Sequence, residues 1–133
     1  MNTALISAGS NINPAESIDK AKELLLSRFR TISFSRNRVT KPVGFTDQPD
    51  FVNAVFCLNT EIDKAELDLE LKNIETLLGR VRTANKNGPR TIDLDVVVWT
   101  GAIVDEDVYT RDFLREMIIE MLPEMKNKIR KEK

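Results

Sequence analysis

The order of strand-like and helix-like segments constrains the fold of this chain more than any other feature. Four segments with apolar or alternating residues predict strands: 3–9, 31–40, 51–60 and 93–99. Amphipathic helices are predicted between the first two strands and between the last two, which makes the order β-α-β-β-α-β. That order is typical of the split βαβ, ferredoxin-like arrangement, an α+β sandwich in which helices pack on an antiparallel sheet.

Both helices begin at sequences that resemble capping motifs. Asn13 precedes a proline and is followed by Glu16, and Asp63 is followed by Glu66, so each pair predicts a capped helix start. Gly79 predicts the end of the second helix. Apolar residues recur at helical spacing in both segments: Ile18, Ala21, Leu25 and Phe29, then Leu67, Leu71, Ile74 and Leu78.

The other segments predict loops, a further helix and a tail. Residues 93–99 carry a continuous valine run, which predicts a central strand covered on both faces. Residues 41–49 contain two prolines and predict a loop, and the polar residues 80–89 predict a mobile one. A third helix is predicted near residues 111–121. The charged residues 126–133 predict a tail that frays.

Size and charge predict one soluble domain over residues 1–133. The 20 Lys and Arg residues nearly balance the 21 Asp and Glu residues, so no overall field attracts nucleic acid or membranes. No apolar run reaches the roughly 20 residues that cross a membrane. No signal peptide is recognisable. We therefore expect a cytoplasmic monomer without nucleic-acid or membrane partners.

The chain has no histidine and one cysteine, Cys57. The absence of histidine excludes Ser-His and Cys-His catalysis and histidine-ligated zinc. A single cysteine excludes an internal disulfide. Because Cys57 lies in an apolar run and has no histidine partner, we expect it to be a small core residue.

Two aspartates mark the candidate site. Asp93 and Asp95 are two residues apart on a predicted strand, so their side chains lie on one face. Adjacent carboxylates repel each other and are costly to desolvate, and a bound divalent cation removes that cost. Oxygen ligands without histidine or thiolate favour Mg²⁺. The alternative is that both aspartates are solvated residues at a strand end.

Basic residues cluster just before the aspartates. A magnesium site beside guanidinium groups suits polyphosphate binding, because phosphoryl transfer depends on positioning and charge neutralisation. The alternatives are a solvated loop or a nucleic-acid patch. The cluster consists of Arg80, Arg82, Lys86 and Arg90.

Four segments, in order, resemble the 6-hydroxymethyl-7,8-dihydropterin pyrophosphokinase family of folate biosynthesis. The most specific is Gly88-Pro89-Arg90-Thr91-Ile92-Asp93-Leu94-Asp95, which is similar to the family signature. The resemblance covers about residues 1–105. The other three segments are Gly9-Ser10-Asn11, Gln48-Pro49-Asp50-Phe51-Val52-Asn53, and Ile74-Glu75 with Gly79-Arg80-Val81-Arg82.

The resemblance implies pyrophosphate transfer from ATP to the pterin hydroxymethyl group, with release of AMP. Asp93 and Asp95 would bind two Mg²⁺ ions. Arg80 and Arg90 would contact phosphates during transfer, and residues 80–90 would close over the substrates as a loop.

The resemblance also implies two sets of substrate contacts. For the pterin, Phe51 would stack on the ring, Asn53 would hydrogen-bond it, and Thr40 and Val43 would offer backbone groups. Alternation places Phe51 and Asn53 on one strand face, although Phe51 could equally be a core residue. Phe113 would complete that site. Contacts to ATP are implied for Lys72, Glu75, Arg82 and Arg111.

The C-terminal third departs from the family pattern. The histidine-containing loop that follows the last core strand in family members is missing, and residues 109–113 resemble a shortened remnant of it. Lys72 stands where the family often has glutamine. Two alternatives to an enzyme therefore stay open: a non-catalytic pterin- or nucleotide-binding module, and an RNA-binding ferredoxin-like domain with exposed aromatic residues on its sheet.

Overall fold

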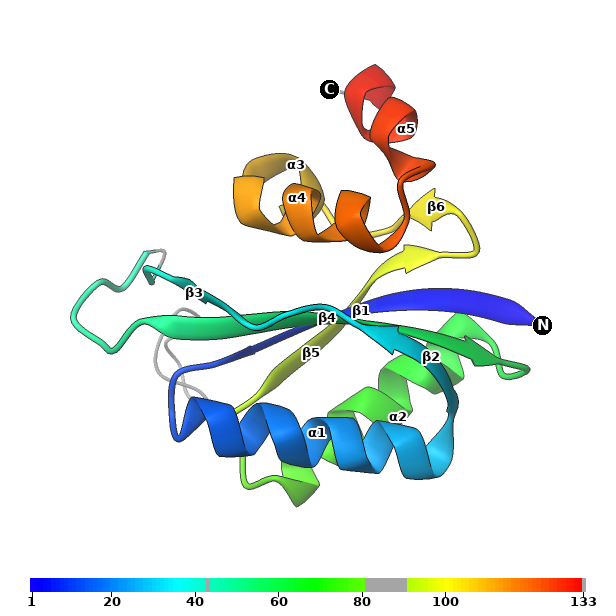
Figure 1. Ribbon diagram of the computed structural model, residues 1–133. Helices are drawn as coiled ribbons and strands as arrows, with labels where there is room; N and C mark the ends of the chain where they lie inside the picture. Colours follow the sequence, from blue (N-terminus) through cyan, green and yellow to red (C-terminus); the bar gives the residue numbers. More distant parts are fainter. Residues whose placement is uncertain (43, 81–90, 133) are drawn as a thin grey trace.

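The computed structural model describes residues 1–42, 44–80 and 91–132. Within these ranges the strands form one antiparallel sheet in the order β2-β4-β1-β5-β6, and β3 pairs with β4 outside that path (Figure 1). The central strand β1 therefore lies between β4 and β5, as the split βαβ arrangement requires. The strands are β1 (Asn2–Ser10), β2 (Arg30–Phe34), β3 (Arg38–Thr40), β4 (Phe51–Thr60), β5 (Asp93–Trp99) and β6 (Ala102–Ile103).

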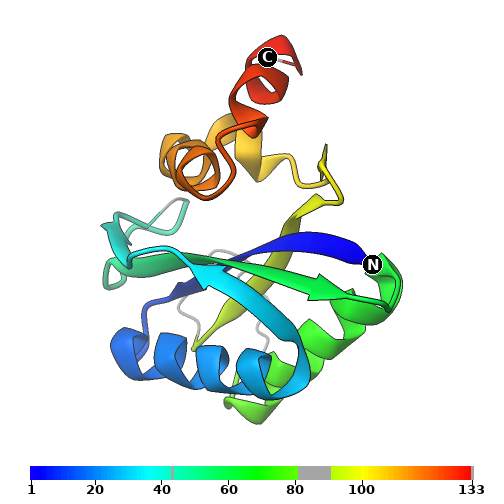
Figure 2. The same cartoon turned by 45° about the vertical axis from the view of Figure 1, so that its right-hand side comes forward.

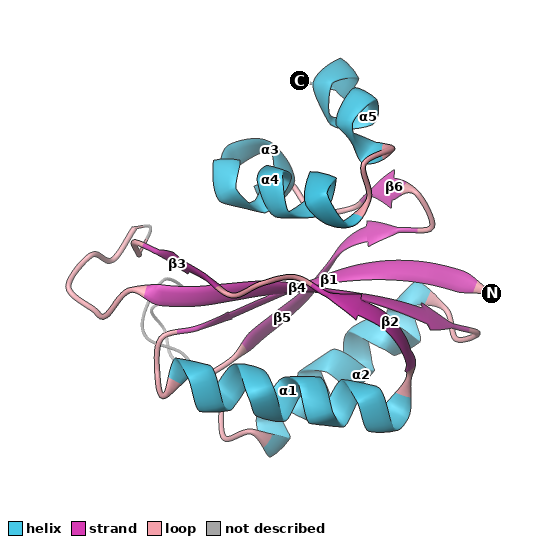
Figure 3. Cartoon of the chain, viewed as in Figure 1, coloured by secondary structure: helices cyan, strands magenta, loops and turns pink. Residues whose placement is uncertain are grey.

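Helices cover both faces of the sheet. The first face carries α1 (Pro14–Arg28) and α2 (Lys64–Leu77), which confirms the two predicted helices (Figures 1 and 3). The opposite face carries α3 (Asp107–Thr110) and α4 (Asp112–Met121), followed by α5 (Met125–Glu132) (Figure 2). None of the helices in the described ranges is long and apolar enough to cross a membrane.

Alternation along the strands divides the buried residues into two cores. Ile6 of β1 and Phe56 of β4 belong to the core beneath α1 and α2, whereas Leu5 and Cys57 belong to the core beneath α4 and α5. Cys57 is buried, as expected, and burial raises the pKa of its thiol.

A bulge in β5 explains its valine run. Val96 pairs with Ile6 and Val98 with Leu5, so Val97 is an extra residue between them. Val96 packs beneath α1 and α2, and Val97 and Val98 pack in the opposite core. The prediction that this strand is covered on both faces is confirmed.

The two helix starts differ. Asp63 has an extended backbone, and its carboxylate accepts a hydrogen bond of 2.8 Å from the Glu66 backbone N–H, as predicted. The predicted side-chain cap at Asn13 is wrong, because Asn13 has a left-handed backbone (φ 46°) and side-chain capping requires an extended one. Gly79 (φ 91°) ends α2 as predicted, with its N–H bonded to Thr76 O.

Two predictions about segment boundaries are corrected. The predicted strand 31–40 is divided into β2 and β3, because the Ser35 hydroxyl accepts the Val55 N–H and replaces the backbone carbonyl at that rung. The predicted fraying tail begins instead as α5. Met125 and Ile129, four residues apart, bury one helix face against the second core.

Candidate active site

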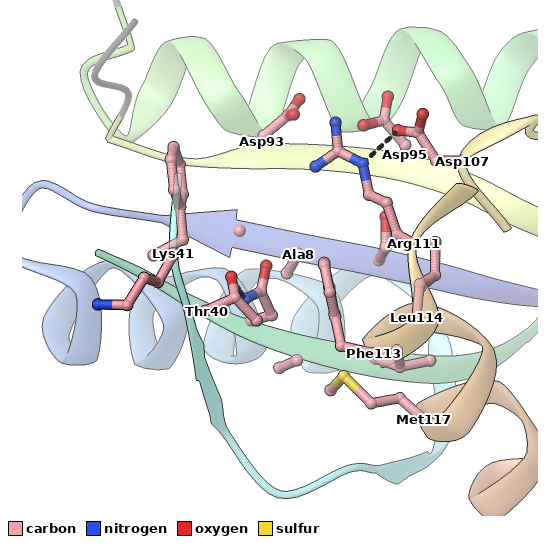
Figure 4. A pocket seen from close by; sticks show the side chains of 16 residues that line it. Ala8, Thr40, Lys41, Asp93, Asp95, Asp107, Arg111, Phe113, Leu114 and Met117 are labelled. Carbon is pink, nitrogen blue, oxygen red and sulfur yellow. Dashed lines mark hydrogen bonds and ion pairs between the residues drawn. The ribbon is translucent and has the colours of Figure 1, made fainter. Parts of the chain in front are cut away.

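A cavity lies between the sheet and the helices α3 and α4 (Figure 4). Its empty volume is about 690 Å³, including space open to solvent. Its walls come from β1, β3, β4 and β5 on one side and from α3 and α4 on the other. The predicted site residues that line it are Thr40, Phe51, Asn53, Asp93, Asp95, Arg111 and Phe113.

Gly9 of β1 leaves space for the β4 side chains that line the cavity. Gly9 pairs directly with Asn53. A Cβ atom at Gly9 would lie 3.3 Å from Asn53 Oδ1 and 3.9 Å from Phe51 Cδ1. The close approach at the first contact explains why a residue without a side chain suits this position of β1.

The two aspartates of β5 lie on the cavity side, while Leu94 between them points into the core beneath α1 and α2. Burial is the main cause that raises the pKa of Asp95 to about 7, and the negative charge of Asp93 adds to it. The Lys72 ammonium, 3.6 Å from Asp95 Oδ1, acts in the opposite direction. Without a bound metal, the Asp93 and Asp95 carboxyl groups therefore resist being ionised at the same time.

Glu75 connects α2 to the edge of β5. Its side chain is 1% exposed, and Oε2 accepts a hydrogen bond of 2.7 Å from the Leu94 backbone N–H. Oε1 lies 3.0 Å from Arg80 Nη1, and Oε2 lies 3.4 Å from Lys72 Nζ. Arg80 also donates to Asp93 Oδ1 at 2.9 Å. A buried carboxylate therefore joins the strand that carries the aspartates to two cations.

The structure separates the predicted residues into two groups. Lys72, Glu75 and Arg80 lie beside β5 and outside the cavity lining, although Lys72 and Arg80 contact the aspartates. Val43, Arg82 and Arg90, together with the rest of the predicted basic loop, lie outside the described residues.

The helices α3 and α4 contribute residues that the sequence did not reveal. Asp107 and Met117 line the cavity, and Arg111 Nε lies 3.6 Å from Asp107 Oδ2 (Figure 4). The only local signal was the spacing of four residues between Asp107 and Arg111, which brings two side chains together on a helix.

The sequence also did not reveal the structural role of Asn11. Its side chain is 4% exposed, and Nδ2 donates to Gln48 Oε1 at 2.7 Å and to Pro49 O at 3.0 Å. Asn11, which directly follows β1, therefore holds the segment that leads into β4 and Phe51.

The aspartate pair fits Mg²⁺ by its chemistry. Both side chains offer carboxylate oxygens, and 26% of the Asp93 side chain and 40% of the Asp95 side chain are exposed. No cluster of three or more possible ligating side chains occurs within residues 1–42, 44–80 and 91–132. Magnesium commonly binds through one or two carboxylates, with phosphates and water as its other ligands, so two carboxylates suffice.

The Asp95→Asn substitution is expected to stabilise the metal-free protein near pH 8. The folded-state pKa of about 7 exceeds the ordinary value of 3.8, so folding favours the protonated carboxyl. This contribution to stability is present below about pH 4 and is lost as the pH rises through about 7. Because 40% of the side chain is exposed, solvent screening limits the gain, which we expect to be about 1 kcal/mol.

Urea denaturation in the presence of a chelator measures this effect. The free energies of unfolding of the variant and the parent protein should differ little near pH 4 and diverge near pH 8. The same difference at both pH values would contradict the raised pKa.

Comparison with known proteins identifies the family. Residues 5–123 match the family described as 7,8-dihydro-6-hydroxymethylpterin-pyrophosphokinase. The 2-amino-4-hydroxy-6-hydroxymethyldihydropteridine pyrophosphokinase of Haemophilus influenzae is 35% identical over 94% of this chain and 84% of its own length. The enzyme of the same name from Methylorubrum extorquens is 36% identical over 92% and 80%, and that from Bacillus subtilis is 31% identical over 98% and 82%. This chain belongs to the hydroxymethylpterin pyrophosphokinase family.

Proposed function

We propose that the protein transfers pyrophosphate from ATP to 6-hydroxymethyl-7,8-dihydropterin. The observation that carries this proposal is the cavity, in which aromatic and amide side chains lie beside a pair of carboxylates. Phe51, Asn53 and Phe113 suit a flat heterocycle, and Asp93 and Asp95 suit the magnesium complex of a polyphosphate. Family membership supports the same reaction.

The reaction joins two substrates in one step. The pterin hydroxymethyl oxygen attacks the β-phosphorus of ATP and forms a new P–O bond. The bond breaks between the β-phosphorus and the oxygen that links it to the α-phosphorus, so AMP leaves with that oxygen. The hydroxyl proton is released. The protein must hold the attacking oxygen and the phosphates in line, because positioning and charge neutralisation provide most of the catalysis.

Asp93 and Asp95 would hold magnesium, and we expect two ions. Bound Mg²⁺ would neutralise phosphate charge and align the β-phosphorus. Arg80 already contacts Asp93, so its guanidinium lies where it could move from the carboxylate to a phosphate. Arg90 is proposed to contact phosphates as well.

Nucleotide contacts are proposed for residues on both sides of the aspartates. Arg111, the residue between α3 and α4, lines the cavity and carries a positive charge near the pair (Figure 4). Lys72 lies 3.6 Å from Asp95 Oδ1 and is close enough to assist a phosphate there. Glu75 holds Lys72 and Arg80 in place. Arg82 is proposed to join the phosphate contacts.

The pterin would lie between β4 and α4. Phe51 and Phe113 both line the cavity and offer ring faces, and Thr40, Asn53 and Val43 are proposed to contact the ring edge. The RNA-binding alternative is less well supported, because the sheet face that would stack bases carries α3 and α4 instead (Figure 2).

Pterin-dependent AMP formation is the decisive measurement. Purified protein mixed with ATP, Mg²⁺ and 6-hydroxymethyl-7,8-dihydropterin should release AMP, because attack at the β-phosphorus expels it. AMP release should cease when either the pterin or Mg²⁺ is omitted. Formation of ADP would indicate a different phosphoryl transfer. Pterin binding in calorimetry without turnover would instead support the non-catalytic binding module.

A further inference from the structure

The Asn53 amide makes two hydrogen bonds to its neighbour β3. Nδ2 donates to Thr40 Oγ1 at 2.6 Å and to the Arg38 backbone carbonyl at 3.2 Å. Strand pairing explains both contacts, because Arg38 pairs with Asn53 and Thr40 lies two residues further along β3. An amide nitrogen carries two protons, so these two acceptors use its full donor capacity.

These partners determine which way the amide points. A backbone carbonyl can only accept a hydrogen bond, so the side-chain atom facing Arg38 O must be the nitrogen. The oxygen must then point the other way, and Oδ1 lies close to Gly9 on the cavity side of β1. No hydrogen-bond donor in the described part of the chain reaches Oδ1. Asn53 therefore offers the cavity an acceptor and no donor.

We propose that the Thr40 hydroxyl is a positioning group that, as the second acceptor beside the Arg38 carbonyl, fixes the hydrogen-bond polarity of the pterin site. It holds the Asn53 amide with its oxygen toward the ligand, so the ligand must present an N–H group there. This inference rests on the proposed function and specifies how its substrate is selected.

The Thr40→Val substitution tests the inference, because valine has a similar shape and lacks the hydroxyl. Without that acceptor, only the Arg38 carbonyl holds the Asn53 amide, so the side-chain oxygen is less firmly fixed toward the ligand. We expect the Kd of 6-hydroxymethyl-7,8-dihydropterin to rise about 10-fold, as the loss of one good hydrogen bond predicts. Thr40→Ser, which retains the hydroxyl, should restore the Kd to within about 2-fold.

A double-mutant cycle shows whether Thr40 acts through Asn53. In an Asn53→Ala background, Thr40→Val should change the Kd by less than about 2-fold, because no amide remains to be oriented. An equal loss of affinity in both backgrounds would overturn the inference and place Thr40 in direct contact with the ligand. An unchanged Kd in the single variant would overturn it as well.

A second measurement needs no ligand and separates this inference from the proposed function. In ¹⁵N-labelled protein, the side-chain amide protons of Asn53 should exchange with solvent at least about 10-fold more slowly than those of the exposed Asn73. Thr40→Val should remove much of this protection. Rapid exchange in the parent protein would overturn the amide orientation, whereas absent pterin binding with protected protons would count against the proposed function alone.

Discussion

Replacing Asp95 by alanine is expected to lower the rate of pterin-dependent AMP formation by about 1,000-fold, or about 4 kcal/mol in activation free energy. The substitution removes one of the two carboxylates that β5 contributes to the cavity lining. The remaining Asp93 is already engaged by Arg80 at 2.9 Å. Magnesium would then lack the second ligand that places the β-phosphorus, and the developing charge would be poorly neutralised.

The assay is initial-rate AMP release over a range of Mg²⁺ concentrations. The Asp95→Asn variant should be almost as impaired, because an amide oxygen keeps the shape but loses the charge. Asp105→Asn is a matched control, since Asp105 is a nearby acidic residue outside the cavity lining and should retain activity within about 3-fold. Normal turnover in Asp95→Ala would refute the assignment of the metal ligand.

Replacing Glu75 by alanine is expected to lower the free energy of unfolding by about 3 kcal/mol. The Glu75 side chain is 1% exposed and accepts the Leu94 N–H, so its removal leaves a buried backbone donor without that acceptor. It also removes a carboxylate 3.0 Å from Arg80, whose side chain is only 14% exposed. Because Arg80 keeps its contact with Asp93, we expect a loss of unfolding free energy at the lower end of the range for breaking a buried ion pair.

Urea denaturation of two companion variants separates burial from charge. Glu75→Gln retains an acceptor for the Leu94 N–H and should lose only about 1 kcal/mol. Glu70→Ala is the control on the same helix, because Glu70 forms an exposed ion pair with Arg28 and should cost less than about 1 kcal/mol. Equal losses in Glu75→Ala and Glu70→Ala would show that the buried contacts contribute little.

The contact between Glu75 and the Leu94 backbone also affects the proposed metal site. Glu75 fixes the backbone of Leu94, which lies between the two proposed metal ligands. A shift of this strand edge would displace both carboxylates together. We therefore expect Glu75→Gln to weaken the response to Mg²⁺ more than it weakens pterin binding.

Features that depend on spacing along one element were predictable from the sequence. Asp93 and Asp95 share the cavity side of β5, and Phe51 and Asn53 share that of β4, because strand side chains alternate. Asp63 caps α2, and Gly79 ends it. The alternation also placed Leu94 on the opposite face. Such rules need only a residue and its near neighbours, so no knowledge of the tertiary fold was required.

Other features depend on the path of the chain between elements or on residues that are far apart in the sequence. Asn13 has capping chemistry but adopts a left-handed backbone, because the chain must turn from β1 into α1 at that point. Residues 126–133 look like a solvated tail, yet Ile129, together with Met125 just before them, packs in a core made with β1, β4 and β5. Local composition could not reveal that partner surface.

By itself, the sequence determined the strand and helix order, the carboxylate pair and the aromatic and amide pair, because each follows from local spacing. The tertiary structure alone decided that these pairs face one cavity, since strand pairing places β1 between β4 and β5. It also decided that Glu75 accepts the Leu94 N–H and that Asn53 donates to the Thr40 hydroxyl. Those contacts join residues 19 and 13 positions apart, and only the burial of two cores on one sheet brings them within hydrogen-bond distance.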